Sequence, residues 1–158
     1  MKKTVRTQAI KGIDPHAAPR RHRPTEANVE RLRMNNKTPL ELITTLLDAR
    51  SRGDIEAAVA CYEVDATMVI EPDHIERGAA AVRSFTQSSF ALPITVLARR
   101  IVDGRDVALH VGKWRLEMAA RGGTSQQLIG CTADILRKQA DGSWLVAVHN
   151  PWGGAVVV

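Results

Sequence analysis

The sequence of 158 residues lacks the features that mark several large classes of protein. It holds no apolar run near the roughly 18 residues that a membrane-spanning helix requires, so we expect no membrane partner. The first residues, Met1 to Lys3, are basic but lead into polar residues, and no secretory signal is expected. The two cysteines, Cys61 and Cys131, lack the spacing of a metal site or a disulfide framework. A cytoplasmic protein with reduced thiols is therefore predicted.

Signatures of several enzyme classes are missing as well. No serine or cysteine has a neighbouring base in a pattern that would support covalent catalysis. No glycine-rich loop has the spacing that cradles phosphate. Glu71, Asp73 and His74 lie too close together in sequence to converge on a metal ion with further ligands. We therefore predict neither a metal site nor a cofactor.

Charge is divided unevenly along the chain. Residues 1–37 hold ten Lys/Arg and three Asp/Glu, a net +7, whereas residues 38–158 hold twelve and fourteen, a net −2. The first segment has few aliphatic residues and scattered prolines, which predicts a disordered basic extension before one domain at 38–158. This extension is either a solvated segment or an arm that touches nucleic acid or a membrane surface non-specifically. If translation starts at Met34, most of the extension is absent from the protein. Because the domain itself is slightly acidic, no specific nucleic-acid partner is predicted.

Three helices are expected in the first half of the domain. Thr38, Pro39 and Glu41 form the start of the first, since threonine caps, proline suits the first turn and glutamate completes a capping box. Gly53 ends this helix, and Asp54 caps a second one. The second helix carries apolar residues at helical spacing, with Tyr62 on its inner face.

A short strand, Ala66–Ile70, and a third helix from Gly78 to Pro93 follow. After Pro93 the period of the hydrophobic residues changes to two, which is typical of strands. Four strands are predicted, at 94–102, 106–118, 127–138 and 144–150, separated by glycine-containing turns. Helices followed by an antiparallel meander indicate an α+β fold, in which a curved sheet wraps three N-terminal helices in the shape of a cone.

The order and spacing of these elements resemble the nuclear-transport-factor-2-like cone fold, which includes ketosteroid isomerases and SnoaL-like polyketide cyclases. The resemblance covers roughly residues 38–153. It is carried by Gly53-Asp54-Ile55-Glu56 through Tyr62, Asp65-Ala66-Thr67, Gly78 with Ala81-Val82-Arg83, and Asp141-Gly142-Ser143-Trp144. Enzymes, binding proteins and assembly domains share this fold, so the reaction must be argued from particular residues.

The resemblance suggests two acidic site residues. In ketosteroid isomerases an aspartate before a proline shuttles the proton, and here Glu71 precedes Pro72; counted from Asp65-Ala66, the same position falls on Ile70. A second aspartate of the isomerases is kept protonated by an apolar pocket and donates to the oxyanion. Asp134, within Cys131-Thr132-Ala133-Asp134-Ile135, resembles it closely.

The resemblance also concerns an aromatic donor. The position of the isomerases' oxyanion tyrosine, on the first helix, corresponds to Leu46 in this sequence. Tyr62 resembles a supporting aromatic position on the second helix, from which it would approach a pocket from another wall.

Strand alternation gives an independent set of inward residues. If Asp134 faces the concave side, the residues sharing that face are Gly130, Thr132 and Leu136, then His110, Gly112, Trp114 and Leu116, then Val146, Val148, Asn150 and Trp152. His149 points to the other face unless a bulge shifts it. His110 is an acid/base group or a satisfied core residue, and Asp134 is a ligand donor or makes a structural hydrogen bond. Trp114 and Trp152 stack on a flat ligand or belong to the core or a dimer contact.

Two functions from different classes remain open. The first is a cofactor-independent isomerase or a cyclase or lyase, in which Glu71 or His110 moves a proton next to a carbonyl and Asp134 and Tyr62 stabilise the enolate. Its ligand would be small and apolar or aromatic, contacted by Tyr62, Trp114, Asn150 and Trp152. The second is a non-catalytic binding or assembly domain that pairs into a homodimer through the outer sheet face. An open cone favours the first and a filled cone the second.

Overall fold

The computed structural model describes residues 27, 30–31, 36–119 and 125–156. The predicted disordered extension and the turn near 121–123 therefore lie almost wholly outside the described residues. The described elements are α2 (Pro39–Ser51), α3 (Ile55–Val59), β1 (Tyr62–Glu71), β2 (His74–Arg77), α4 (Ala79–Phe90), β3 (Ile94–Asp103), β4 (Val107–Ala119), β5 (Ser125–Lys138), β6 (Trp144–His149) and the short 3-10 helix η1 (Gly153–Val156).

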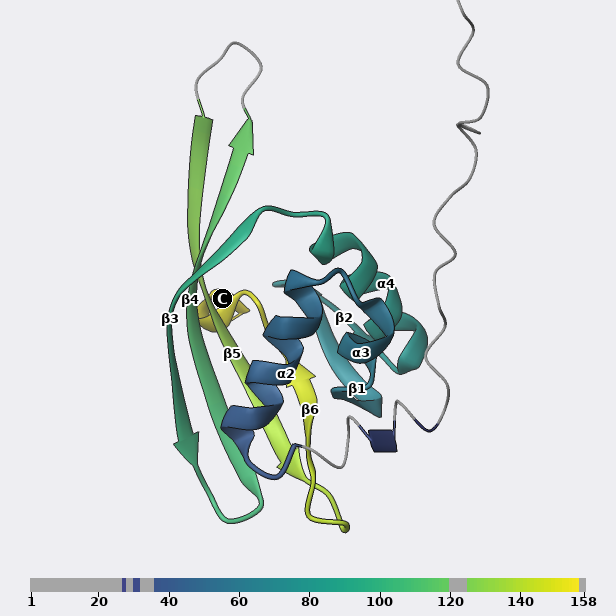
Figure 1. The fold of residues 1–158 in the computed structure, drawn as a ribbon. Helices are drawn as coiled ribbons and strands as arrows, with labels where there is room; N and C mark the ends of the chain where they lie inside the picture. The colour runs from purple at the N-terminus through teal and green to yellow at the C-terminus, as the bar shows by residue number, and fades with distance from the viewer. Residues whose placement is uncertain (1–26, 28–29, 32–35, 120–124, 157–158) are drawn as a thin grey trace, which may run out of the picture.

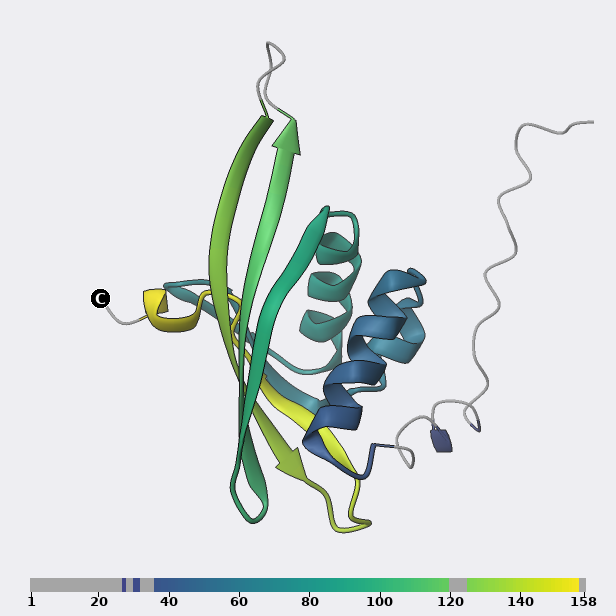
Figure 2. The ribbon, with the colours of Figure 1, turned by 60° about the vertical axis from the view of Figure 1, so that its left-hand side comes forward.

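The six strands form one sheet in the order β2-β1-β6-β5-β4-β3. Neighbours run antiparallel except β1 and β6, which are parallel. The sheet is curved, and the helices lie against its concave side (Figures 1 and 2). This is the α+β architecture that the sequence predicts, with long strands folded over a helical layer.

The start of α2 shows why the sequence forms a helix there. The Glu41 amide donates to Thr38 Oγ1 at 3.2 Å, and the Thr38 amide donates to Glu41 Oε2 at 2.9 Å. This reciprocal pair satisfies two amides that a helix start otherwise leaves unbonded. Gly53 follows the helix with φ of 65°, a conformation that glycine adopts without the steric cost of a side chain. The predicted boundaries of α2 are confirmed.

The second helix is shorter than predicted, and this changes the setting of Tyr62. Helix α3 ends at Val59, and Tyr62 is the first residue of β1 rather than a helical residue. Valine, threonine and isoleucine are frequent from Val64 to Ile70, and these residues favour strands. Strand β1 therefore begins earlier than the predicted Ala66, and His74–Arg77, for which no strand is predicted, pairs with it as β2.

A bulge in β6 alters which side chains face inward. Leu136 of β5 pairs with Val146, but the next residue, Ile135, pairs with Val148, so β6 holds one extra residue between the two pairs. Beyond an extra residue the alternation of a strand reverses. The prediction that Val148 faces inward and His149 outward is therefore wrong, and His149 lies on the concave side.

The main core lies between the helices and the lower part of the sheet. Its large, fully buried side chains come from five elements: Leu42 and Ile43 of α2, Met68 of β1, Val82 of α4, Leu136 of β5 and Val146 of β6. This packing fixes α2 and α4 over the sheet. The upper part of the sheet projects past these helices (Figure 1).

Candidate active site

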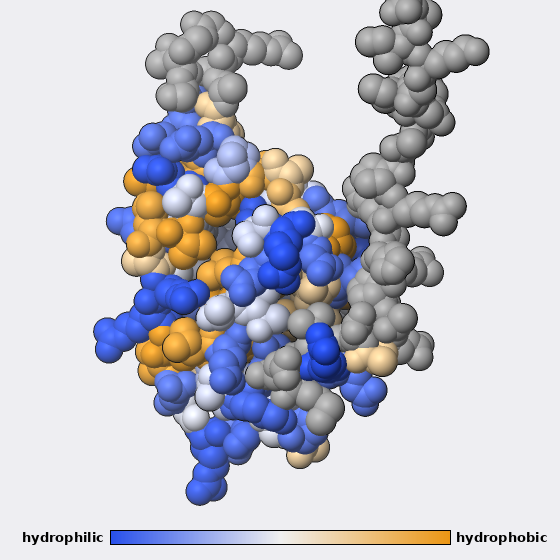
Figure 3. All heavy atoms as spheres, viewed as in Figure 1, coloured by the Kyte–Doolittle hydropathy of each residue, from blue (hydrophilic) through white to orange (hydrophobic). Residues whose placement is uncertain are grey.

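The concave side of the sheet and the helices enclose a cavity of about 480 Å³. Its walls are mostly apolar, with Leu46 of α2, Phe85 of α4 and Trp114 of β4 among the lining residues. Figure 3 shows hydrophobic side chains gathered over the upper part of strands β3 to β5. Val96 of β3 and Leu128 of β5 line the cavity and remain partly exposed. The volume lies in the range typical of small-molecule sites.

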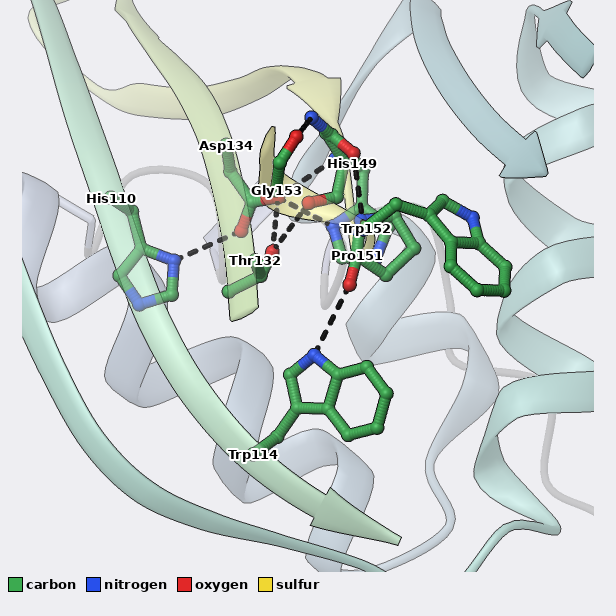
Figure 4. A network of polar contacts seen from close by, with 9 residues as sticks. His110, Trp114, Thr132, Asp134, His149, Pro151, Trp152 and Gly153 are labelled. Atoms are coloured by element: carbon green, nitrogen blue, oxygen red, sulfur yellow. Dashed lines mark hydrogen bonds and ion pairs between the residues drawn. The ribbon is translucent and has the colours of Figure 1, made fainter. Parts of the chain in front are cut away.

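His110 and Asp134 meet on the sheet wall of this cavity. They are direct partners in the β4–β5 register, so both side chains stand on the concave face. His110 Nδ1 lies 2.9 Å from Asp134 Oδ2 (Figure 4). Both residues are buried, with side chains 10% and 4% exposed. Alternation predicted this face correctly for both residues.

Asp134 has further partners on its other oxygen. The Asn150 amide donates to Oδ1 at 2.9 Å, and the Thr132 hydroxyl lies 2.9 Å from the same atom. Thr132 Oγ1 is also 2.9 Å from the Asn150 carbonyl, and its single hydrogen serves one acceptor at a time. His149 Nδ1 lies 3.0 Å from Oδ1 but outside hydrogen-bond geometry, so the two groups form an ion pair when His149 is protonated.

These contacts decide the charge of Asp134. Burial alone would raise the pKa of its carboxyl, but the positive charge of His149 and the hydrogen bonds from His110 and the Asn150 amide outweigh it and hold the pKa below the usual range. Of these, the His149 contact acts by its charge, because its geometry is not that of a hydrogen bond. Asp134 is therefore an ionised acceptor, unlike the protonated donor that the resemblance implies.

An ionised Asp134 also fixes the proton on His110. A carboxylate only accepts hydrogen bonds, so the imidazole hydrogen belongs on Nδ1. Neutral His110 then keeps a lone pair on Nε2, which makes no hydrogen bond with any described residue. Gly112, which also lines the cavity, lies beside this edge: a Cβ there would be in ordinary contact with Nε2, at 3.7 Å, but would clash with Thr132 Cγ2, at 2.6 Å. The cavity thus holds a free imidazole nitrogen that can accept a proton.

Two tryptophans close one end of the cavity. Trp114 Nε1 donates to the Pro151 carbonyl at 3.2 Å, and Trp152 Nε1 donates to the Ile70 carbonyl at 3.0 Å. Both line the cavity, as the inward face predicts. Asn150 instead lies behind the wall: its side chain bonds within the turn to Gly153, and it is not among the lining residues.

Tyr62 lines the cavity from β1. It is 4% exposed, and its hydroxyl makes no hydrogen bond with a described residue. Burial, the largest cause, and the charge of Asp134 raise the pKa of the phenol, so it stays a neutral donor. Its ring packs edge-on against His149, with centroids 6.0 Å apart. Leu46, which the resemblance matches to the isomerases' tyrosine, lines the apolar wall.

Glu71 does not reach this site. It is exposed at the end of β1, where it pairs with His74 of β2, and it is absent from the cavity lining. Ile70, the preceding residue, lines the cavity instead. The pairing of β1 with β2 shifts by one residue between Val69 and Glu71, and Ile70, not Glu71, has its side chain at the cavity. Glu71 therefore lies outside this cavity, and no described contact supports a role for it as the proton-transfer base.

Sequence reasoning did not identify His149 or Arg50 as cavity residues. A bulge brings His149 inward, and the sequence of its strand contains no signal that predicts this bulge. Arg50, the arginine in the last turn of α2, lines the cavity.

Among the described residues, no group of three or more His, Cys, Asp or Glu side chains could hold a metal ion. No helix in the described part of the chain is long and apolar enough to cross a membrane, and the cytoplasmic location stays a prediction.

Comparison with known proteins identifies the fold. No family model matches the chain, and no curated protein matches it. Solved structures do match. A proposed ketosteroid isomerase from Shewanella frigidimarina is 18% identical with a TM-score of 0.57, over 68% of this chain and 89% of that one. A proposed dehydratase of the nuclear-transport-factor-2-like family from Streptomyces avermitilis is 14% identical with a TM-score of 0.55, over 68% and 88%.

A third match comes from a different functional class. It is a proposed calcium/calmodulin-dependent protein kinase type II association domain from Thiobacillus denitrificans, 17% identical with a TM-score of 0.57, over 72% of this chain and 92% of that one. The chain has the nuclear-transport-factor-2-like fold, with ketosteroid isomerase-like proteins among its structural neighbours. At these identities the likeness extends to the fold alone.

Proposed function

We propose that the protein is a cofactor-independent enzyme that moves a proton next to a carbonyl of a small apolar substrate. The observation that carries the proposal is the His110–Asp134 pair, buried on the wall of an apolar cavity. A histidine oriented by an ionised carboxylate is suited to act as a general base near neutral pH. Matches named as an isomerase and a dehydratase support the same reaction class.

In this mechanism His110 Nε2 accepts a proton from the carbon beside the carbonyl. Asp134 holds the ring so that Nδ1 carries the hydrogen, and it stabilises the imidazolium that forms. The hydroxyl of Tyr62, buried and without a described partner, donates to the oxygen of the enolate as charge develops there. Where the substrate carries a carbon–carbon double bond conjugated with the enolate, return of the proton from His110 to the far carbon of this dienolate completes an isomerisation, with the double bond shifted.

Deuterium exchange tests the proton transfer without knowledge of the natural substrate. In D₂O at neutral pD, 2-tetralone, a flat bicyclic ketone, exchanges the protons beside its carbonyl, and proton NMR follows their loss. We expect the protein to accelerate this exchange and His110→Gln to lower the protein-dependent rate by about a hundredfold or more, the usual contribution of a general base. Near-UV circular dichroism of each variant checks that it folds.

Glu71→Gln is the matched control, because Glu71 is exposed and outside the cavity lining. It should exchange 2-tetralone at the wild-type rate. Exchange no faster than in buffer at saturating protein would overturn the proposal, as would a His110→Gln variant of wild-type rate. A large loss of exchange rate in Glu71→Gln would indicate that Glu71, not His110, is the base.

We also propose that the outer face of the sheet pairs two copies of the chain, which is the basis of the alternative assembly function. Val102, Val107, Val111 and Ile129 come from β3, β4 and β5, and each is more than a third exposed. Their register places them all opposite the cavity face. Exposed apolar patches of this kind mark protein interfaces, and association domains occur among the structural matches.

Light scattering coupled to size-exclusion chromatography tests the pairing. The wild type should run at twice the monomer mass, and Val111→Glu should run as a folded monomer. Val64→Glu is the control, since Val64 is 74% exposed and lies on β1, outside the β3–β5 patch. A monomeric wild type at micromolar concentration would contradict the homodimer.

A further inference from the structure

Arg50 places a positive charge in the wall of the cavity. It lies in the last turn of α2, is half-buried and lines the cavity. Its Nη2 donates to the carbonyls of Ser89, at 2.6 Å, and Leu92, at 3.0 Å, at the end of α4. The guanidinium also lies over the Phe90 ring, 5.3 Å from its centroid. Arg50 is therefore held in one place by the neighbouring helix.

These bonds use only part of the guanidinium. An arginine carries five N–H donors, of which Nη2 supplies two. The three on Nε and Nη1 have no hydrogen-bond partner among the described residues, and Arg50 forms no ion pair with a described carboxylate. Burial lowers the pKa of Arg50, a sign that the cation has lost part of its hydration. A fixed and partly dehydrated cation without a counter-ion is costly unless something negative pairs with it.

The other charged residues of the cavity do not neutralise Arg50. Asp134 is the one carboxylate among the lining residues, and it already pairs with His110 and His149. Lys113, the other lysine or arginine in the lining, is exposed. Thr86 of α4 is 2% exposed, lines the cavity, and has a hydroxyl without a described partner. The α2–α4 wall therefore offers unused donors and an excess of positive charge.

We infer that Arg50 forms an anion subsite and that the substrate of the proposed enzyme is an apolar acid whose carboxylate binds there. This inference rests on the proposed function, since it needs a ligand in the cavity. Arginine suits a planar carboxylate because its donors form a fork that matches two oxygens. The apolar body of such a substrate would lie between Arg50 and His110, with the carbonyl toward His110.

Two probes of one shape test the subsite: 2-naphthoate, which is anionic, and 2-naphthamide, which is neutral. Their dissociation constants are measured by calorimetry at neutral pH and physiological salt. We expect the wild type to bind naphthoate about tenfold more tightly than the amide, the effect of one charge-assisted hydrogen bond. Arg50→Gln should bring the ratio near one, and Arg50→Lys should keep part of it. Because the two probes have the same shape, a general loosening of the cavity would weaken both equally and leave the ratio of their dissociation constants unchanged.

Two variants serve as controls. Arg52→Gln removes an exposed arginine outside the cavity lining, and Lys113→Gln removes the other lining cation. Both should keep the preference for naphthoate. Equal affinities in the wild type, or loss of the preference in Lys113→Gln but not in Arg50→Gln, would overturn the subsite while leaving a working cavity. If neither probe binds, the subsite and the proposed small-molecule function fall together.

Discussion

Gly130 leaves the space that Trp114 occupies, and filling that space should disturb the cavity wall. The two residues are direct partners on β4 and β5. A Cβ on Gly130 would lie 2.1 Å from Trp114 Cζ2. Non-bonded carbons settle about 3.5 Å apart, so Gly130→Ala must push the indole by about 1.4 Å. The indole is not free to yield, because Nε1 is bonded to the Pro151 carbonyl at 3.2 Å.

The expected cost follows from these contacts. Over-packing costs about 1–3 kcal/mol, and loss of the Trp114 hydrogen bond adds about 1 kcal/mol. We therefore expect Gly130→Ala to lower the free energy of unfolding by about 2–4 kcal/mol, and Tm by about 5–10 °C. Urea denaturation measures the first, and the indole N–H resonance of Trp114 reports the broken bond.

Gly154→Ala is the control, because a Cβ there would meet nothing within 4 Å. It should differ from the wild type by less than about 0.5 kcal/mol, as surface changes usually do. A Gly130→Ala variant as stable as Gly154→Ala, with an unchanged Trp114 resonance, would refute the packing described for this wall.

Three further predictions concern stability. Thr38→Ala should cost about 1 kcal/mol in urea denaturation by removing the cap of α2, and a smaller loss than Ser51→Ala would contradict that role. Leu136→Ala should cost about 2–5 kcal/mol, since this side chain is fully buried; a cost below 1 kcal/mol would argue against the core as described. The pKa of Asp134 is lower in the folded protein than in the unfolded chain, where a carboxyl has a pKa near 4. The ionised carboxylate therefore stabilises the folded state above about pH 4, and this stabilisation is lost as the pH falls toward the folded-state pKa. The stability gap between wild type and Asp134→Asn should therefore shrink below about pH 4, and a gap that widens there would mean the carboxyl is protonated.

The strand half of the fold could be predicted closely because its signals are local. Hydrophobic residues alternate in β3 to β6, and glycine marks turns between strands, so the expected strands agree with the observed ones within two residues at each end. The same alternation placed His110, Asp134 and Trp114 on one face. These residues sit in unbroken stretches of the β4–β5 ladder, where a period of two holds throughout.

The remaining site residues depend on features that a local pattern does not hold. His149 turns inward because of a bulge that shows only in the pairing of β6 with β5. Tyr62 fits a helical period with the residues before it, but pairing with β6 draws it into a strand. Arg50 belongs to the site because α4 packs beside α2, a contact between segments about 40 residues apart in sequence.

The most direct test of the proposed chemistry is the tautomer of His110 in the free protein. Long-range nitrogen–proton NMR on protein labelled with ¹⁵N-histidine distinguishes a protonated ring nitrogen from one with a free lone pair, and the His110→Gln spectrum assigns the signals. At neutral pH the hydrogen should be on Nδ1, facing Asp134, and Nε2 should be unprotonated. A hydrogen on Nε2, with Nδ1 as acceptor, would mean that Asp134 is the protonated partner and that His110 is not the free base of this cavity.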